Sequence, residues 1–328
     1  MGLLYGAVAC TRFNAAVPPD GPDFEAAPFR EIEPGSEVRE RIGFVPFEPD
    51  APYEVGVRRW AFRIRIDKRT PDATAVRERV AGLVKTEIEL TGRPYVGGKR
   101  RKELRALAEH ELLIGQRPRT RILECVLDNS LLFVGSATKT ALGTVLALLR
   151  QAGVATEFKA PWLDNAPEAD ESSDIVIPKE PGQSVLGCRF LRALLEDPEV
   201  LIEPETGSVR LATREAKITL AGGVLNELHR LVADGAEMLA AKILVGTVPL
   251  RFDALSYRLA GVKLEPVKAE HWTEELGLRL DQIAALWDTL DTKYAAVASR
   301  LGPVAAAGSA EESAEIIERA EPAHRAGA

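Results

Sequence analysis

The fold is decided first by an alternating octapeptide, Trp60-Ala61-Phe62-Arg63-Ile64-Arg65-Ile66-Asp67. Successive side chains of a β-strand point to opposite faces of its sheet, so the apolar residues of this stretch share one face and the charged residues share the other. The pattern predicts a half-buried strand with a basic outer row.

Two helices are expected directly after this strand. Thr70-Pro71-Asp72 has the composition of a helix start, with Thr70 as the N-cap, and Gly92-Arg93-Pro94 ends the helix. The second helix follows a Gly97-Gly98 turn and begins with Lys99-Arg100-Arg101-Lys102. Four cations at a helix start oppose the helix macrodipole, which favours negative charge there. Such a departure from a local rule indicates either a functional surface or an ordinary solvated one.

The rest of the chain is expected to mix strands, helices and long connections. The expected elements are a strand at 3–13, an apolar segment at 43–47, a hairpin turning at Asp128-Asn129-Ser130, a helix from Thr138 to Gly153, a helix at 187–196, a hairpin at 199–213, a helix at 222–233, strands within 238–265, and a helix from Thr273 to Arg300. Long irregular connections without regular βαβ alternation favour an α+β fold of mixed antiparallel sheets and packed helices.

We expect this α+β region to cover residues 1–300, with a central basic segment at 54–153 and a possible excursion at 160–185. Residues 301–328 are rich in Ala, Glu and Gly, and we expect a disordered acidic tail there. The sequence contains no apolar run long enough for a transmembrane helix, and its three cysteines and four histidines follow no zinc-binding spacing. No cofactor is therefore expected.

Charge is distributed very unevenly along the chain. The chain has a net charge of −7, but the window from Glu54 to Arg121 contains 18 Lys/Arg and 9 Asp/Glu, a local balance of +9. A polyanion responds mainly to charges within about 10 Å in moderate salt, so the local balance matters more than the total. One basic region on an acidic body is compatible with a DNA partner.

Twelve cations in or near this window are candidates for contact with DNA phosphates. They are Arg63, Arg65, Lys68, Arg69, Lys99, Arg100, Arg101, Lys102, Arg105, Arg117, Arg119 and Arg121. Lys and Arg that neutralise phosphates release counterions, which suffices for binding without sequence preference. The alternative is that these rows are ordinary solvated faces. Aromatic residues are not interleaved with the basic clusters, which favours duplex over single-strand binding.

The order of motifs between Lys99 and Gly153 resembles the recombination-associated protein RdgC family. A basic helix is followed by Leu112-Leu113, a strand ending in Asp128, a strand leading to Ala137, and a helix ending Leu148-Leu149-Arg150. Upstream, Gly43-Phe44-Val45-Pro46 resembles the Gly-aromatic-Val-Pro motif of that family. Downstream, Gly187 with Phe190-Leu191 resembles its Gly-x-x-Phe-Leu helix.

The resemblance implies a ring-shaped homodimer that encircles double-stranded DNA, binds it without sequence preference and antagonises RecA-dependent recombination. It also implies a cytoplasmic, nucleoid-associated protein that is not an enzyme. One motif departs from the family. Ile114-Gly115-Gln116-Arg117 stands where family members have Pro-Arg-Ala-Phe, so the aromatic residue near their intersubunit contact is missing.

Two other functions remain open from the residues alone. Asp281, Asp288 and Asp291 recur along the final predicted helix, and a metal-dependent DNA nuclease or processing enzyme would use such carboxylates with magnesium. A wet helix face explains the same residues. The third hypothesis is a protein-interaction scaffold whose basic face meets an acidic partner.

Overall fold

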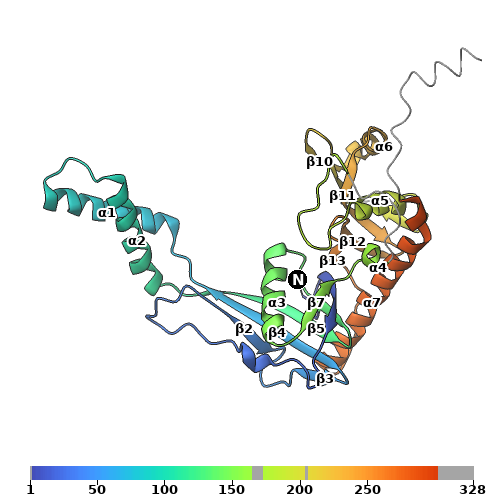
Figure 1. The fold of residues 1–328 in the computed structure, drawn as a ribbon, viewed down its shortest axis with the longest axis horizontal. Coiled ribbons are helices and arrows are strands. Elements are labelled where there is room, and N and C mark those ends of the chain that lie inside the picture. Colours follow the sequence, from blue (N-terminus) through green and yellow to red (C-terminus); the bar gives the residue numbers. More distant parts are fainter. Residues whose placement is uncertain (1, 165–172, 204–205, 302–328) are drawn as a thin grey trace, which may run out of the picture. The chain divides into compact units, whose positions relative to one another are not determined.

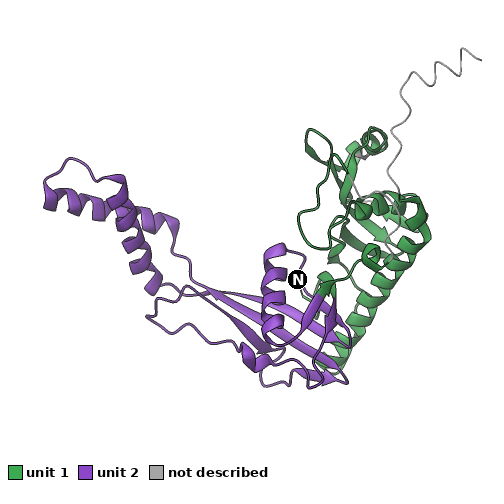
Figure 2. Cartoon of the chain, viewed as in Figure 1, with its two compact units in different colours: residues 1–13, 157–328 green, residues 14–156 purple. Residues whose placement is uncertain are grey.

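The computed structural model describes residues 2–164, 173–203 and 206–301, and within them the chain has an α+β fold. Thirteen strands and seven α-helices are present in these ranges, and the strand pairs described below are antiparallel (Figure 1). The predicted α+β class with antiparallel sheets and packed helices is confirmed, whereas the RdgC-like ring-shaped homodimer stays a prediction. The chain divides into two compact units, one formed by Asn14–Thr156 and one by Met1–Phe13 with Glu157–Ala328 (Figure 2).

The sheet of the unit 14–156 is built around the predicted alternating strand. Its strand order is β6 (Leu131–Val134), β5 (Arg119–Asp128), β4 (Arg59–Lys68) and β2 (Glu40–Pro46), with β3 (Glu54–Gly56) also paired to β4. The predicted hairpin at Asp128-Asn129-Ser130 joins β5 to β6, and Asn129 has the positive φ of 55° that such a turn requires.

An aromatic cluster fills one face of this sheet. Phe24, Phe44 and Phe62 meet with ring centroids 5.1–5.6 Å apart, and Phe62 and Ile64 are fully buried, as the alternation predicts. The backbone of residues 28–29 lies against Gly43 of β2. A Cβ added at Gly43 would lie 2.4 Å from the Cα of Phe29. The glycine of the Gly-Phe-Val-Pro motif therefore permits a close backbone approach.

The helical hairpin extends the same unit. It consists of α1 (Ala73–Thr91) and α2 (Gly98–Ile114), which pack against each other. The N-cap of α1 is Asp72, whose Oδ1 accepts hydrogen bonds from the backbone N–H groups of Thr74 and Ala75, so the prediction of Thr70 as the cap is wrong. An aspartate accepts two orphan N–H groups, which explains the later start. Gly92 ends α1 in the left-handed conformation, as expected.

The last helix of this unit is α3 (Lys139–Gln151), followed by the short strand β7 (Ala155–Phe158). Thr138 is its N-cap residue, as predicted, although its side chain makes no capping hydrogen bond. Leu142, Val145 and Leu149 are buried on one side of the helix, and Gly153 turns the chain with a φ of 79°.

The sheet of the other unit has the strand order β10 (Lys217–Ala221), β9 (Ser208–Ala212), β11 (Glu237–Val245), β12 (Val248–Asp253), β13 (Arg258–Val262) and β1 (Val8–Ala16). The predicted hairpin at 199–213 is wrong. The strand β8 (Val200–Ile202) and β9 both pair with β11, and β9 forms its hairpin with β10. Similar apolar runs do not specify which strand each one joins.

Helices complete this unit. The helix α5 (Val185–Leu194) packs on β11, and α7 (Trp272–Val297) packs on α5 and on α4 (Pro161–Asp164). The predicted apolar stripe of α7 is buried from Ile283 to Tyr294. The predicted helix at 222–233 is a 3-10 turn, Gly222–Glu227, followed by α6 (Leu228–Ala233).

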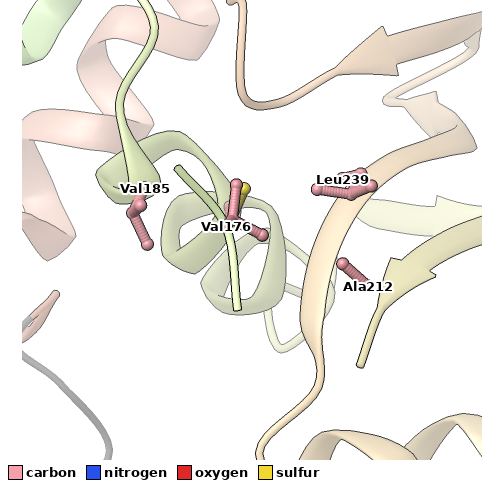
Figure 3. Packing of buried hydrophobic residues seen from close by; sticks show 5 residues of the cluster. Val176, Val185, Ala212 and Leu239 are labelled. Carbon is pink, nitrogen blue, oxygen red and sulfur yellow. The ribbon is translucent and has the colours of Figure 1, made fainter. Parts of the chain in front are cut away.

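The segment expected to be an excursion at 160–185 contributes to the core where it is described. Figure 3 shows Val176 beside the start of α5, facing Ala212 and Leu239 of the sheet. The first residues of the chain are held by a buried arginine. Gly6 has a φ of 71°, and the Arg279 guanidinium donates to the carbonyl oxygens of Leu3 and Gly6 at 2.9 and 2.7 Å. The first strand therefore begins at Val8 rather than at residue 3.

None of the described helices is both long and apolar enough to span a membrane. The tail predicted to be disordered lies, apart from Leu301, outside the described residues.

Candidate nucleic-acid interface

The twelve predicted cations all lie in the unit 14–156, but they do not form one surface. They lie on both faces of the β4–β5 pair, just beyond the ends of these strands, and on α2. The register pairs Arg63 with Glu124 and Lys68 with Arg119. Because residues an odd number of positions apart on a strand point to opposite faces, Arg63 and Arg65 lie on one face, and Lys68, Arg119 and Arg121 on the other.

The arginines of the first face are engaged by carboxylates and aromatic rings. A 3.1 Å ion pair joins Arg63 to Glu124, and the Arg63 guanidinium lies over Phe47 at 4.4 Å from the ring centroid. Arg65 donates to both carboxylate oxygens of Asp67 at 3.0 and 2.8 Å. The side chains of Arg63 and Arg65 are 20% and 31% exposed. Their charge is thus largely neutralised within the protein.

Asp67 is the centre of this network, and its position differs from the expected solvent-facing row. The residue is 1% exposed and also accepts a hydrogen bond from the Thr120 hydroxyl at 2.7 Å. Burial alone would raise the pKa of Asp67, but the hydrogen bonds from Arg65 and Thr120 and the charge of Arg65 outweigh it and lower this pKa. Asp67 therefore stays ionised and holds β4 to β5.

Arg69 has a structural position. Its guanidinium donates to the backbone carbonyl oxygens of Ser36 and Glu33 at 2.9 and 3.1 Å, and the residue is 5% exposed. These bonds anchor the irregular connection before β2. A buried guanidinium of this kind has little access to a DNA phosphate.

The cations of the second face lie at the open end of the strands, beyond the buried Phe62 and Ile64 of the same face. The Lys68 side chain is 61% exposed, and its Nζ lies 3.5 Å from Oε1 of Glu40. Arg119 and Arg121 are exposed at alternate positions of β5, as predicted for an extended connector, and Arg121 reaches the Thr138 hydroxyl at 3.4 Å. Arg117 is exposed just before the strand.

The basic start of α2 is the most accessible cluster. Lys99, Arg101 and Lys102 are exposed, and within the described ranges no ion pair engages them. Arg100 is different, because it binds the Glu87 carboxylate of α1 at 2.9 and 3.0 Å and Glu103 at 3.0 Å. Arg105 pairs with Glu109 at 2.9 Å.

The geometry of the helix end adds to this positive field. Gly97, the N-cap of α2, provides no side-chain cap, so the first backbone N–H groups of the helix have no capping oxygen. The N-terminus of a helix carries a partial positive charge that attracts anions. Three exposed cations therefore surround a helix end that also favours an anion.

Two further residues of the hairpin escaped the sequence-based selection. Arg77 of α1 faces the start of α2 across a surface groove that both helices line. Tyr95, between the helices, is 73% exposed and sits close in sequence to the basic cluster. Its position two residues after Arg93 and four before Lys99 was the available signal.

The carboxylates considered for a nuclease are not gathered at one site. Asp291 is partly exposed and accepts hydrogen bonds from the buried Arg12 and from the hydroxyl of the buried Tyr257, both at 2.7 Å. Asp281 and Asp288 are exposed. Among the residues that the structure describes, no three His, Cys, Asp or Glu side chains are grouped so that they could hold a metal ion.

No protein-family model matches this chain, and a search of curated proteins finds no match.

Proposed function

We propose that this chain binds double-stranded DNA without sequence preference, through the basic start of α2 assisted by Lys68 and by Arg117, Arg119 and Arg121. The exposed, unpaired cluster of Lys99, Arg101 and Lys102 at an uncapped helix N-terminus carries the proposal. Lysines and arginines that meet only phosphates give affinity but read no bases.

The finer parts of the proposal rest on the resemblance to the RdgC family. They are that the protein acts as a homodimer, that the dimer encircles the duplex, and that occupancy of the DNA limits RecA. The departure at Ile114-Gly115-Gln116-Arg117 means that a dimer of this chain would use other contacts at that place.

A salt titration tests the DNA-binding proposal. Short duplexes of three unrelated sequences are titrated with the protein between 50 and 200 mM salt. We expect similar affinities for all three and a steep loss of affinity as salt rises, since each neutralised phosphate contributes a slope of about −0.9 in log K against log salt. Absent binding, or binding indifferent to salt, would refute it.

The effect on recombination is tested separately. RecA-driven strand exchange is measured with duplex incubated beforehand with the protein. We expect the exchange rate to fall in proportion to the duplex occupied. An unchanged rate on fully occupied duplex would remove the RecA part of the proposal and leave DNA binding standing.

A further inference from the structure

The strand β10 is an edge strand of its sheet. It pairs with β9 in an uninterrupted antiparallel register that begins with Lys217 opposite Ala212, and within the described ranges no strand pairs with its outer side. Both β10 and β11 are antiparallel to β9, so the connection from β10 to β11 crosses a face of the sheet rather than its edge. The turn Gly222–Glu227 in this connection packs on β9 as well as on β10.

The backbone groups of β10 alternate between its two sides. The hairpin with β9 closes with a hydrogen bond from the Thr213 N–H to the Ala216 carbonyl oxygen. Because bonded and unbonded positions alternate along an antiparallel pair, Ile218 and Leu220 also turn their N–H and C=O groups toward β9. The N–H and C=O groups that point outward are those of Lys217, Thr219 and Ala221. They form a row of donors and acceptors that a further strand can join.

The unit 14–156 protects an edge of its own sheet in a way that β10 lacks. There the chain itself covers the outer side of β2, because the Phe44 N–H donates to the Ala27 carbonyl oxygen at 2.9 Å and the Phe44 carbonyl oxygen accepts from the Phe29 N–H at 3.0 Å. The strand β2 also ends in Pro46, which has no N–H. The strand β10 contains no proline and no bulge, and its one charged residue, Lys217, lies at its end. Unpaired edges are usually blunted by such features.

The sequence of β10 is suited to pairing with itself. When two copies run antiparallel with Thr219 on the two-fold axis, Thr219 lies opposite its own counterpart and Lys217 lies opposite Ala221. In this register every outward N–H and C=O group of both strands has a partner. A shift in either direction leaves an outward residue of each copy without one.

The side chains agree with this register. Ile218 of each copy lies opposite Leu220 of the other, in a pair without hydrogen bonds, where side chains approach most closely. On the opposite face two threonines meet, which is a favourable cross-strand pair, and each Lys217 lies beside a small Ala221 rather than beside another lysine. The backbone edge alone accepts any extended peptide, whereas these side-chain pairs favour a second copy of the same strand.

We propose that β10 is a dimer interface, at which two copies of the chain pair antiparallel around Thr219 and join their sheets into one. The contact is small, since β10 has five residues, and we expect a dissociation constant on the order of micromolar. The interface assigns one contact to the homodimer of the proposed function and rests on it in that respect, but it does not require DNA.

Single introduced cysteines test the register. The native Cys10, Cys125 and Cys188 are buried, so exposed cysteines on β10 oxidise before them. In the Thr219→Cys variant, the Cα atoms of the two substituted residues would lie about 5.5 Å apart, a distance that a disulfide spans. We expect mild oxidation of the full chain to give a disulfide-linked dimer on a non-reducing gel.

The flanking positions of β10 provide matched controls. Lys217→Cys alone should cross-link at least tenfold less, because the two copies of residue 217 lie about 14 Å apart along the strands. A mixture of Lys217→Cys and Ala221→Cys chains should cross-link again, because these residues lie opposite each other. An absent link in Thr219→Cys, or an equal yield in Lys217→Cys alone, would overturn the pairing.

A proline tests the outward hydrogen bonds. Thr219→Pro removes an N–H that points away from β9, so the bonds between β9 and β10 remain. We expect the dissociation constant of the dimer, measured by sedimentation, to rise at least tenfold relative to Thr219→Val, which keeps the N–H. Equal constants in two variants of similar melting temperature would overturn the interface. If Thr219→Pro unfolds, Thr219→Lys replaces it, since it places like charges opposite each other on the axis.

The interface and the proposed function fail in distinguishable ways. A Thr219→Cys cross-link in a protein that binds no duplex would leave the interface standing and refute the proposed function. Duplex binding by a chain in which Thr219→Cys gives no cross-link would leave the DNA contact standing and refute the interface.

Discussion

Removing the three unpaired cations of α2 is the sharpest test of where DNA binds. The variant Lys99→Ala/Arg101→Ala/Lys102→Ala takes away exposed charges that make no ion pair within the described part of the chain. Alanine is the strongest helix former, and it removes charges that oppose the helix dipole, so α2 should be at least as stable as before.

The size of the effect follows from counterion release. If each cation neutralises one phosphate, three contacts contribute about 2.7 to the slope of log K against log salt. Between 50 and 200 mM salt the original protein should then lose roughly 40-fold more affinity than the variant loses. The same slope also gives the gain in affinity over a tenfold change in salt. From 1 M to 0.1 M salt each contact raises the binding constant roughly eightfold, and the three together raise it about 500-fold.

The assay is fluorescence anisotropy of a labelled duplex at four salt concentrations. The control variant Lys217→Ala/Arg251→Ala/Lys268→Ala removes one arginine and two lysines that are exposed in the other unit, so it matches the change in charge and residue type. It should lose little affinity. If the α2 variant loses no more than the control, or if its salt slope is unchanged, the assignment of the contact to α2 is refuted.

Three structural predictions separate folding from binding. Asp67→Ala should lower the free energy of unfolding by about 3 kcal/mol, because it leaves Arg65 and Thr120 without their buried acceptor. The pKa of Asp67 is lowered in the folded state, so the part of this difference that depends on its charge should be present at neutral pH and be lost as pH falls through the folded-state pKa, as urea unfolding at several pH values will show. Arg69→Met should lower the free energy of unfolding by about 2 kcal/mol in the same urea assay and change duplex affinity less than twofold. A larger loss of affinity would show that Arg69 belongs to the DNA contact. Gly187→Ala should lower the free energy of unfolding by about 3 kcal/mol and lower the melting temperature, because the added Cβ would lie 2.1 Å from the Ala254 carbonyl oxygen. An unchanged melting temperature would contradict this packing.

The strand at the centre of the unit 14–156 was predictable because its signal is local. Alternation from Trp60 to Asp67 specifies a period of two, and β4 covers that stretch. The burial of Asp67 was not predictable, since its partner Thr120 is 53 residues away and comes beside it only when β5 pairs with β4. Alternation alone places every charged residue in solvent.

Strand partners were harder to predict than strands. The residues at 199–213 do form two strands, but each pairs with β11, which comes later in the chain. A short apolar run predicts that a segment is extended but does not predict which strand it pairs with. The same limit explains Arg69, whose acceptors at Glu33 and Ser36 lie in an irregular connection without periodicity.

The run Lys99-Arg100-Arg101-Lys102 shows how tertiary structure divides residues that look equivalent in sequence. Packing of α2 on α1 brings Glu87 to Arg100, whose charge is then shared with two carboxylates. Lys99, Arg101 and Lys102 make no ion pair within the described part of the chain. Their charges remain at a helix end where the helix dipole favours acidic residues. A helix selected only for stability would have Ser or Asp at its N-cap position. The N-cap of α2 is Gly97, and exposed cations follow it. An arrangement that lowers the stability of its own helix and concentrates unpaired positive charge is expected where an anion binds. The proposed DNA contact is therefore assigned to α2 rather than to the better-neutralised Arg63 and Arg65 of β4.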